Sequence, residues 1–147
     1  MTSWRDATPQ RVQDDLDAVV TAALDAALAL LSKNGEFFPF GVTISDAGDV
    51  AMAAADPGLG ERPESVTVLA SLYAGVEHNR ANYRAAGFVA DVRANGADAV
   101  RIEAEHRDGG PALVVLMAYA KKGLVKKSVA YGQMSAGGGE RRIWQPD

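Results

Sequence analysis

Apolar residues recur every three or four positions along two long stretches of the chain, and this spacing predicts two amphipathic helices. The first begins at Thr8-Pro9, where a threonine can cap the helix and a proline is tolerated at the first position. It ends at Lys33-Asn34-Gly35, a cationic last turn followed by a glycine. The second covers roughly residues 63–85. Gly75 lies inside it, where we expect close packing, because a mid-helix glycine costs about 1 kcal/mol relative to alanine.

Apolar and polar residues alternate in the remaining segments, which is typical of strands with one buried face. Two strands are expected at residues 37–45 and 50–55. Four more follow residue 87, with a tight turn at Asp108-Gly109 and a three-residue turn at Lys121 to Gly123. The order α-β-β-α-β-β-β-β predicts one α+β domain over residues 1–147, with both helices packed on one face of an antiparallel sheet. Residues 1–7 and 135–147, the latter with three consecutive glycines, are expected to be flexible termini.

The same alternation predicts how neighbouring strands pair. The expected pairs are Val92 with Val100, Ala90 with Ile102, Ile102 with Val115, Ala104 with Leu113, Val115 with Val129 and Leu113 with Tyr131. The first two pairs also place Asp91 opposite Arg101, a favourable charge pair on the other face. A structure with Asp91 on the helix-covered face would overturn this register, because a one-residue slip turns every side chain over.

Composition restricts the classes of function. The 147 residues carry a net charge of −4, which argues against non-specific nucleic-acid binding, since that depends on basic surface. There are no cysteines, so disulfides, thiolate metal sites and thiol nucleophiles are excluded. No apolar run approaches the ~20 residues of a membrane-spanning helix, and the N-terminus lacks the apolar region of a signal peptide. We therefore expect a cytoplasmic protein without nucleic-acid or membrane partners.

Two histidines and two glutamates are the candidates for catalytic or metal-binding residues. His78 is expected on the solvent side of the second helix, without a convergent partner. His106 lies on the apolar side of its strand, where a half-buried ring that caps the core is favoured over a pocket histidine. Glu103 and Glu105 alternate with apolar residues beside two arginines, so an ion-paired, solvated face is favoured over an acid–base pair. The sequence predicts no catalytic residues, no metal site and no cofactor.

Four lysines form the one dense basic cluster of the sequence: Lys121, Lys122, Lys126 and Lys127. Such a cluster could bind an anion or an acidic partner. Protection of an exposed strand edge is the favoured interpretation, because lysines on the last strand of a meander discourage pairing with other chains.

The stretch DAVRIEAEHRDGGPALVVLMAY at residues 98–119, with FFPFGVTISDAGDV at 37–50, resembles a group of small bacterial α+β proteins for which no activity is assigned. The resemblance spans residues 31–131 and implies no catalytic residues. The order of elements is similar to that of cone-shaped folds of the nuclear-transport-factor-2 type, in which helices and a curved sheet enclose a pocket. That likeness implies a pocket with Phe40, His106 and Tyr119 as candidate lining residues.

Two hypotheses of function follow from different features. An apolar patch with no helix left to cover it favours a non-enzymatic interaction or accessory module, which forms a homodimer or a partner complex and buries Leu116. The residues of this patch are Val89, Val114, Leu116, Ala118 and Ala130. The alternative is a small-ligand-binding or hydrolase- or isomerase-like protein with a pocket between the helices and the sheet. The first hypothesis is favoured, and any small molecule stays unidentified.

Overall fold

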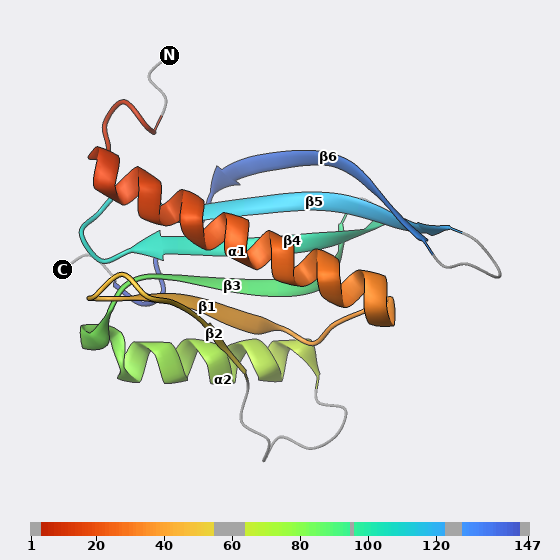
Figure 1. Ribbon diagram of the computed structural model, residues 1–147, viewed down its shortest axis with the longest axis horizontal. Coiled ribbons are helices and arrows are strands. Elements are labelled where there is room, and N and C mark those ends of the chain that lie inside the picture. Colours follow the sequence, from red (N-terminus) through yellow and green to blue (C-terminus); the bar gives the residue numbers. More distant parts are fainter. Residues whose placement is uncertain (1–3, 55–63, 95, 123–127, 145–147) are drawn as a thin grey trace.

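The computed structural model describes residues 4–54, 64–94, 96–122 and 128–144, and Figure 1 shows their arrangement. Helix α1 is Gln10–Asn34 and helix α2 is Ser65–His78, which is followed by a short 3-10 helix, η2, at Arg80–Asn82. The strands are β1 (Phe40–Ser45), β2 (Val50–Ala53), β3 (Tyr83–Ala94), β4 (Ala97–His106), β5 (Leu113–Lys122) and β6 (Ser128–Gly138). They form an antiparallel sheet in the order β2-β1-β3-β4-β5-β6, so the predicted α+β fold and its order of elements are confirmed.

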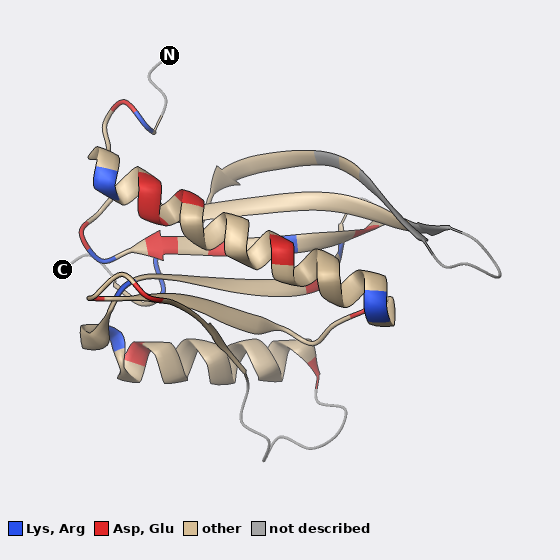
Figure 2. Cartoon of the chain, viewed as in Figure 1, with Lys and Arg blue, Asp and Glu red and all other residues tan. Residues whose placement is uncertain are grey.

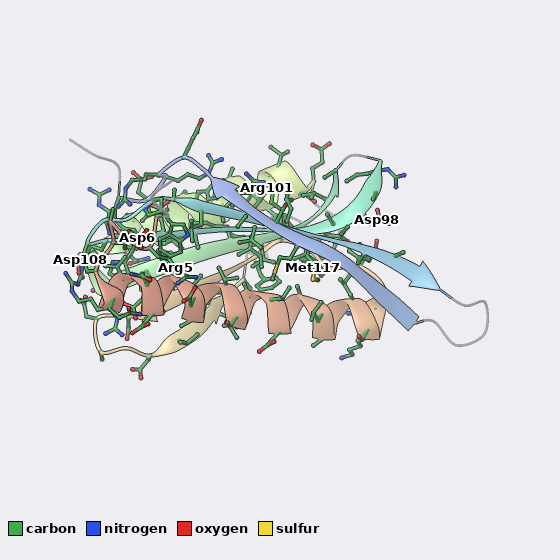
Figure 3. All side chains as sticks on the ribbon, turned by 90° about the horizontal axis from the view of Figure 1, so that it is seen from above. Arg5, Asp6, Asp98, Arg101, Asp108 and Met117 are labelled. Atoms are coloured by element: carbon green, nitrogen blue, oxygen red, sulfur yellow. The ribbon has the colours of Figure 1, made fainter. Side chains whose placement is uncertain are left out.

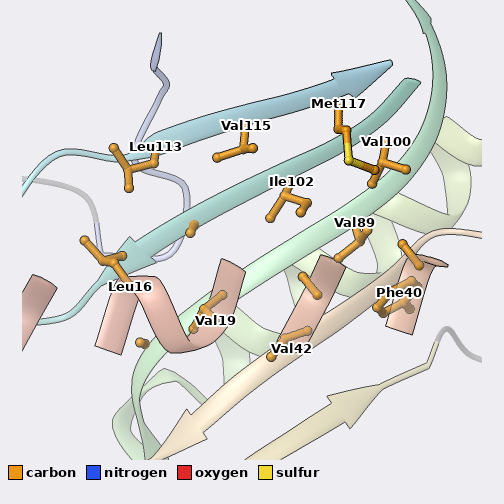
Figure 4. Close-up of a cluster of buried hydrophobic side chains, with 14 of the residues drawn as sticks. Leu16, Val19, Phe40, Val42, Val89, Val100, Ile102, Leu113, Val115 and Met117 are labelled. Carbon is orange, nitrogen blue, oxygen red and sulfur yellow. The ribbon is translucent and has the colours of Figure 1, made fainter. Parts of the chain in front are cut away.

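Helix α1 crosses the sheet diagonally and buries one apolar stripe against it (Figure 1). The stripe follows the helical repeat and consists of Val12, Leu16, Val19, Ala23, Ala27 and Leu31. Gly35 ends the helix with φ of 77° and donates its N–H to the carbonyl of Leu31, as the sequence predicts. At the other end, the hydroxyl of Thr8 donates to the carbonyl of Trp4 instead of capping the helix. Figure 4 shows the resulting core between α1 and strands β1, β3, β4 and β5.

The two helices cover opposite faces of the sheet, which corrects the prediction that both pack on one face. Neighbouring residues of β3 belong to different buried clusters: Ala85 and Val89 to the cluster of α1, Ala86 and Phe88 to that of α2. Residues 85–90 of β3 are buried on both faces, so this part of the sheet needs cover on both sides. The two sides are named here the α1 face and the α2 face.

The pairing of β3 with β4 differs from the predicted register by one residue. Asp91 lies opposite Val100 rather than Arg101, and so it falls on the α1 face, which overturns the predicted pairs of these strands. Two positions, Asn95-Gly96, separate the strands in the sequence, and Gly96 has φ of 78°. An Asn-Gly dipeptide favours a two-residue hairpin turn, and this local preference outweighs a single cross-strand charge pair.

The pairing of β4 with β5 confirms the predicted register. Ile102 lies opposite Val115, and Ala104 lies opposite Leu113. All four side chains belong to the α1 cluster, so burial on this face agrees with the register that the glycine-bearing turn favours.

The pairing of β5 with β6 is displaced from the prediction. Val115 lies opposite Ala136 rather than Val129, because Lys121 and Lys122, which are predicted to form a turn, belong to β5 and pair with Val129 and Ser128. Residues 123–127 lie outside the described residues. Since β5 is apolar on both faces, its own pattern does not restrict the register, and the prediction here is wrong.

Both ends of the described chain contact the rest of the fold, although residues 1–7 and 135–147 are predicted to be flexible. Trp4 packs against the α1 cluster. Residues 135–138 belong to β6, and Ile143 is buried in the α2 cluster. The glycine-rich stretch is therefore followed by an apolar anchor, which corrects the flexible-terminus prediction for the described part of this end.

Candidate functional site

A short segment at the C-terminal end of the described chain lies along the α2 face of β4. This C-terminal segment, residues 140–144, follows β6 and has no helix or strand of its own. It contacts Glu103 and Glu105, whose side chains share one face because successive strand residues alternate. They are only 7% and 3% exposed, so the predicted solvated face is corrected to a buried one.

The carboxylate of Glu105 holds the backbone of the C-terminal segment. It accepts N–H groups from three consecutive residues, Arg142 at 2.8 Å, Ile143 at 2.9 Å and Trp144 at 2.8 Å. Hydrogen bonds to an ionised carboxylate are roughly twice as strong as those between neutral groups. A single side chain thus fixes the path of three peptide units.

The carboxylate of Glu103 holds a side chain of the segment. Arg142 donates Nε–H to its Oε2 at 2.7 Å, while Tyr73 of α2 and Arg101 of β4 donate to its Oε1. Burial acts to raise the pKa of Glu103, but the hydrogen bonds from Tyr73 and Arg142 and the charge of Arg101 outweigh it, so the pKa lies below its ordinary value. Burial and the bond to Glu103 raise the pKa of Tyr73 to about 12.

The segment also makes apolar and aromatic contacts with α2. Ile143 shares a buried cluster with Val68, Leu72, Val76, Ala86 and Phe88. The guanidinium of Arg142 lies 4.6 Å from the ring centroid of Tyr73, within the range of a cation–π interaction. Arg141 donates to the carbonyl of His106 at 2.7 Å. Backbone, charged and apolar contacts converge on a few consecutive residues, as they do where a domain recognises a linear peptide.

His106 is buried at the end of β4, with both ring nitrogens engaged. The backbone N–H of Asp108 donates to Nδ1 at 3.0 Å, so the ring proton lies on Nε2, which donates to Asp15 of α1 at 2.8 Å. Arg84 of β3 donates to the same carboxylate at 3.1 Å. The ring therefore joins α1 to the sheet, and it is more deeply buried than the half-buried ring that the sequence predicts. His78 is exposed in the last turn of α2.

The three candidate pocket residues lie at separate points on the α1 face. His106 is the last residue of β4, whereas Tyr119 lies opposite Asp98 near its start, about 26 Å away along the strand. Figure 3 shows Asp98 and Asp108 at opposite ends of the molecule. Phe40 lies between these ends, and buried side chains fill the space around it (Figure 4). The structure does not bring the three residues together.

The five candidate interface residues do not share one surface. Val114, Leu116 and Ala118 lie on the α2 face of β5 and are partly exposed. Val89 is 0% exposed within the α1 cluster, which corrects its assignment to the patch; β3 turns its odd-numbered residues at this point toward α1. Ala130 belongs to β6, and its side chain lies outside the described part of the structure.

The edge strand β6 has no lysine. Its sequence, SVAYGQMSAGG, has no charged residue. The part of β6 that Figure 2 describes is tan, the colour of uncharged residues. Lys121 and Lys122 belong to β5, whereas Lys126 and Lys127 lie outside the described residues.

The described residues contain neither a group of metal-binding side chains nor a membrane-spanning helix. Among the described residues, no three histidine, aspartate or glutamate side chains are grouped so that they could hold a metal ion. No helix in the described ranges is long and apolar enough to cross a membrane. Comparison of the chain with protein-family models, with curated proteins and with solved structures finds no match.

Proposed function

We propose that the chain is a protein-interaction module that associates with a second copy of itself through the edge strand β6. The support comes from the strand: β6 has 11 residues, none of them charged and none a proline. An edge strand presents unpaired N–H and C=O groups, and proteins ordinarily protect long edges with charged side chains or prolines. The opposite edge strand, β2, has only 4 residues. β6 is therefore the edge to which a further strand would add.

A second copy suits this edge because β6 can pair with itself. Antiparallel pairing of two identical strands places the same residues on both sides of a two-fold axis, the commonest symmetry of protein dimers. The whole chain has a net charge of −4, but β6 contributes none of it, so the two strands meet without like-charge repulsion. The antiparallel sheet then continues across the axis.

The surface beside β6 adds apolar area on both faces. Val114 and Leu116 of β5 lie on the α2 face, opposite Gly137 and Ser135, which are too small to cover them. On the α1 face, Met134 of β6 lies opposite Met117 and is 56% exposed. Large apolar side chains beside an open edge are typical of a contact surface. Leu116 is the residue of β5 that we expect the association to bury.

A role in binding rather than catalysis is supported by the contacts of the polar residues. The ring nitrogens of His106 and the carboxylates of Glu103 and Glu105 are engaged by groups of the chain itself. A general acid or base must lie within hydrogen-bond reach of its substrate. These three buried groups instead hold elements of the fold together.

Substitution of Met134 by lysine tests the proposal. Met134→Lys supplies the charge that edge strands ordinarily carry, and we expect it to weaken self-association by at least about tenfold, because each copy brings the same charge to the interface. Met52→Lys is the matched control, since Met52 is 52% exposed, close to the 56% of Met134, but lies on β2. Sedimentation equilibrium over a range of concentrations measures the dissociation constant of all three proteins.

The unmodified protein and Met52→Lys are expected to sediment as dimers at concentrations where Met134→Lys is a monomer. An unmodified protein that stays monomeric at every concentration contradicts the proposal. If Met134→Lys and Met52→Lys weaken the dimer equally, the assignment of the interface to β6 is contradicted. An added charge would then weaken the dimer from either edge strand.

A further inference from the structure

We propose that the C-terminal segment, residues 140–144, is an exchangeable ligand of a peptide-binding site, and that this site also takes the same segment from a second copy of the chain. The site consists of Glu103, Glu105 and Tyr73, together with the apolar side chains of α2 and β3 that surround Ile143. It differs from the β6 edge, and the proposal holds whether or not β6 pairs.

Three kinds of recognition define the ligand. Glu105 accepts the N–H groups of residues 142–144, which any peptide without proline at these positions presents when its backbone bends as it does here. Glu103 and the ring of Tyr73 select an arginine at position 142, and the apolar cluster selects an aliphatic side chain at the next position. The chemical class of ligand is therefore a peptide with an arginine followed by an aliphatic residue.

Charge favours an occupied site. Glu103 and Glu105 lie side by side on one strand face with Arg101 as their neighbouring cation, so a groove without the segment carries excess negative charge. Buried carboxylates without partners are costly. When the segment leaves its groove, binding of another basic segment neutralises this charge, whereas an empty groove does not. Exchange of segments between two copies is therefore favoured over an empty groove.

The start of the segment borders a gap in the packing of the described structure. A small cavity, with room for about one water molecule, lies between the start of the segment and the sheet. Its lining includes Glu103, Glu105, Gly139 and Glu140. The strands beneath it pair with one another along their length, so the walls of the groove are formed without the segment.

The last two residues of β6, directly before the connection to the segment, have more backbone freedom than the fold requires. Only glycine fits at position 139 without a steric clash, because a Cβ there would lie 2.7 Å from Cγ2 of Val114. Gly137 and Gly138 have neither a positive φ nor any atom within 4 Å of where a Cβ would lie. Glycine at these two positions therefore adds backbone freedom without a steric need. A segment that moves from one groove to another needs such a connection.

Binding of a synthetic peptide to the full chain tests this inference. The peptide comprises residues 139–144 with an amidated C-terminus and a fluorescent label. The protein is the Ile143→Asp variant, in which a charge in the apolar cluster releases the chain's own segment. We expect fluorescence anisotropy to show saturable binding, at least about tenfold tighter than to the unmodified chain, whose own segment competes.

Two controls make the result specific. A peptide that carries aspartate in place of Ile143 is expected not to bind. Glu105→Gln, added to the Ile143→Asp protein, is expected to weaken binding at least about tenfold, because an uncharged amide replaces the carboxylate. Equal binding of both peptides, or no saturable binding to a folded Ile143→Asp variant, overturns the inference. Met134→Lys is expected to leave peptide binding unchanged, which separates this site from the β6 interface.

Hydrogen exchange of the unmodified chain tests the same inference without a substitution in the segment. We expect the amides of Arg142, Ile143 and Trp144 to exchange at least about tenfold faster than that of Ile102 in β4, because the segment leaves its groove while the sheet stays folded. Equal exchange rates would mean that the segment is released only by global unfolding, and would overturn the inference even if Ile143→Asp does not fold.

Discussion

Glu103 stays ionised in a buried position because both oxygens of its carboxylate accept hydrogen bonds. The donors are Tyr73, Arg101 and Arg142, which belong to α2, β4 and the C-terminal segment. Without such partners, a buried carboxylate costs several kcal/mol of desolvation. The charge on this one residue therefore stabilises the contact of three parts of the chain.

Acid is expected to weaken the fold through Glu103. Because its pKa is lowered in the folded chain, its charged form contributes stability that is complete above the ordinary value of 4.5 and is lost as the pH falls below it. Glu103→Gln does not ionise, so we expect a lower free energy of unfolding at neutral pH and a flatter decline from about pH 5 to pH 3. Urea unfolding at several pH values measures this. Exposed Glu64→Gln is the control, and equal slopes for all three proteins contradict the prediction.

Sequence patterns indicate which polar residues lie near the core, but not which groups they contact. The position of His106 on an apolar strand face correctly places it beside the core. The partners of Glu105 are backbone N–H groups of a segment 37 to 39 positions away, and no side-chain pattern marks them. The signal that could have revealed the site is Ile143-Trp144, an apolar pair directly after a basic pair in a stretch otherwise typical of a flexible end.

Gly87 allows α1 to lie close to β3. A Cβ at this position would lie 2.4 Å from Cγ1 of Val19 and 3.0 Å from the carbonyl oxygen of Glu103. Neither neighbour has room to move, because the interior is close-packed. Gly75 of α2 is the opposite case: it is exposed, with no atom within 4 Å of where a Cβ would lie, so the close packing expected there is absent.

Alanine at these two glycines is expected to change stability in opposite directions. Gly87→Ala should lower the free energy of unfolding by about 1–3 kcal/mol through overpacking. Gly75→Ala should raise it by up to about 1 kcal/mol, because alanine is the better helix former. Urea unfolding measures both. In the Gly87→Ala background, Val19→Ala should cost less than in the unmodified chain, and equal costs contradict the contact.

Helices and turns follow from local signals, whereas strand registers and helix placement depend on more distant ones. Gly35 ends α1 as predicted, and the turn after β4 gives the register with β5. The register of β3 with β4 also has a local signal, Asn95-Gly96, but the prediction is based on the charge pair of Asp91 and does not use it. The face that α2 covers is not encoded in its own apolar stripe, because either side of the sheet could accept it.

The helices and the C-terminal segment cover some strands of the sheet and leave others exposed. Helix α1 covers the middle of one face, while α2 and the C-terminal segment cover β1, β3 and part of β4 on the other. The α2 face of β5 and the free edge of β6 receive no helix in the described structure (Figure 1). The uncovered area is thus contiguous and next to an open edge, which is the arrangement that self-association requires.

The two proposed contacts are expected to respond differently to salt. The β6 pairing involves no charged residue, so the dimer dissociation constant should change little between low and high ionic strength. Peptide binding at Glu103 and Glu105 pairs arginine with carboxylate, so it should weaken as salt rises. Sedimentation and fluorescence anisotropy at the same two salt concentrations measure these responses. A strong salt dependence of the dimer contradicts pairing through β6.

Gly110 contacts residues from both the beginning and the end of the described chain. A Cβ on Gly110 would lie 3.2 Å from Cγ2 of Thr8, just before α1, and its carbonyl accepts a hydrogen bond from Arg141 at 3.1 Å. The early and late parts of the chain therefore rest on the same loop. Fraying of chain ends is the usual first local opening of a protein. We expect the opening of residues 4–8 and of the C-terminal segment to be coupled, because the departure of either one removes support from the loop on which the other rests.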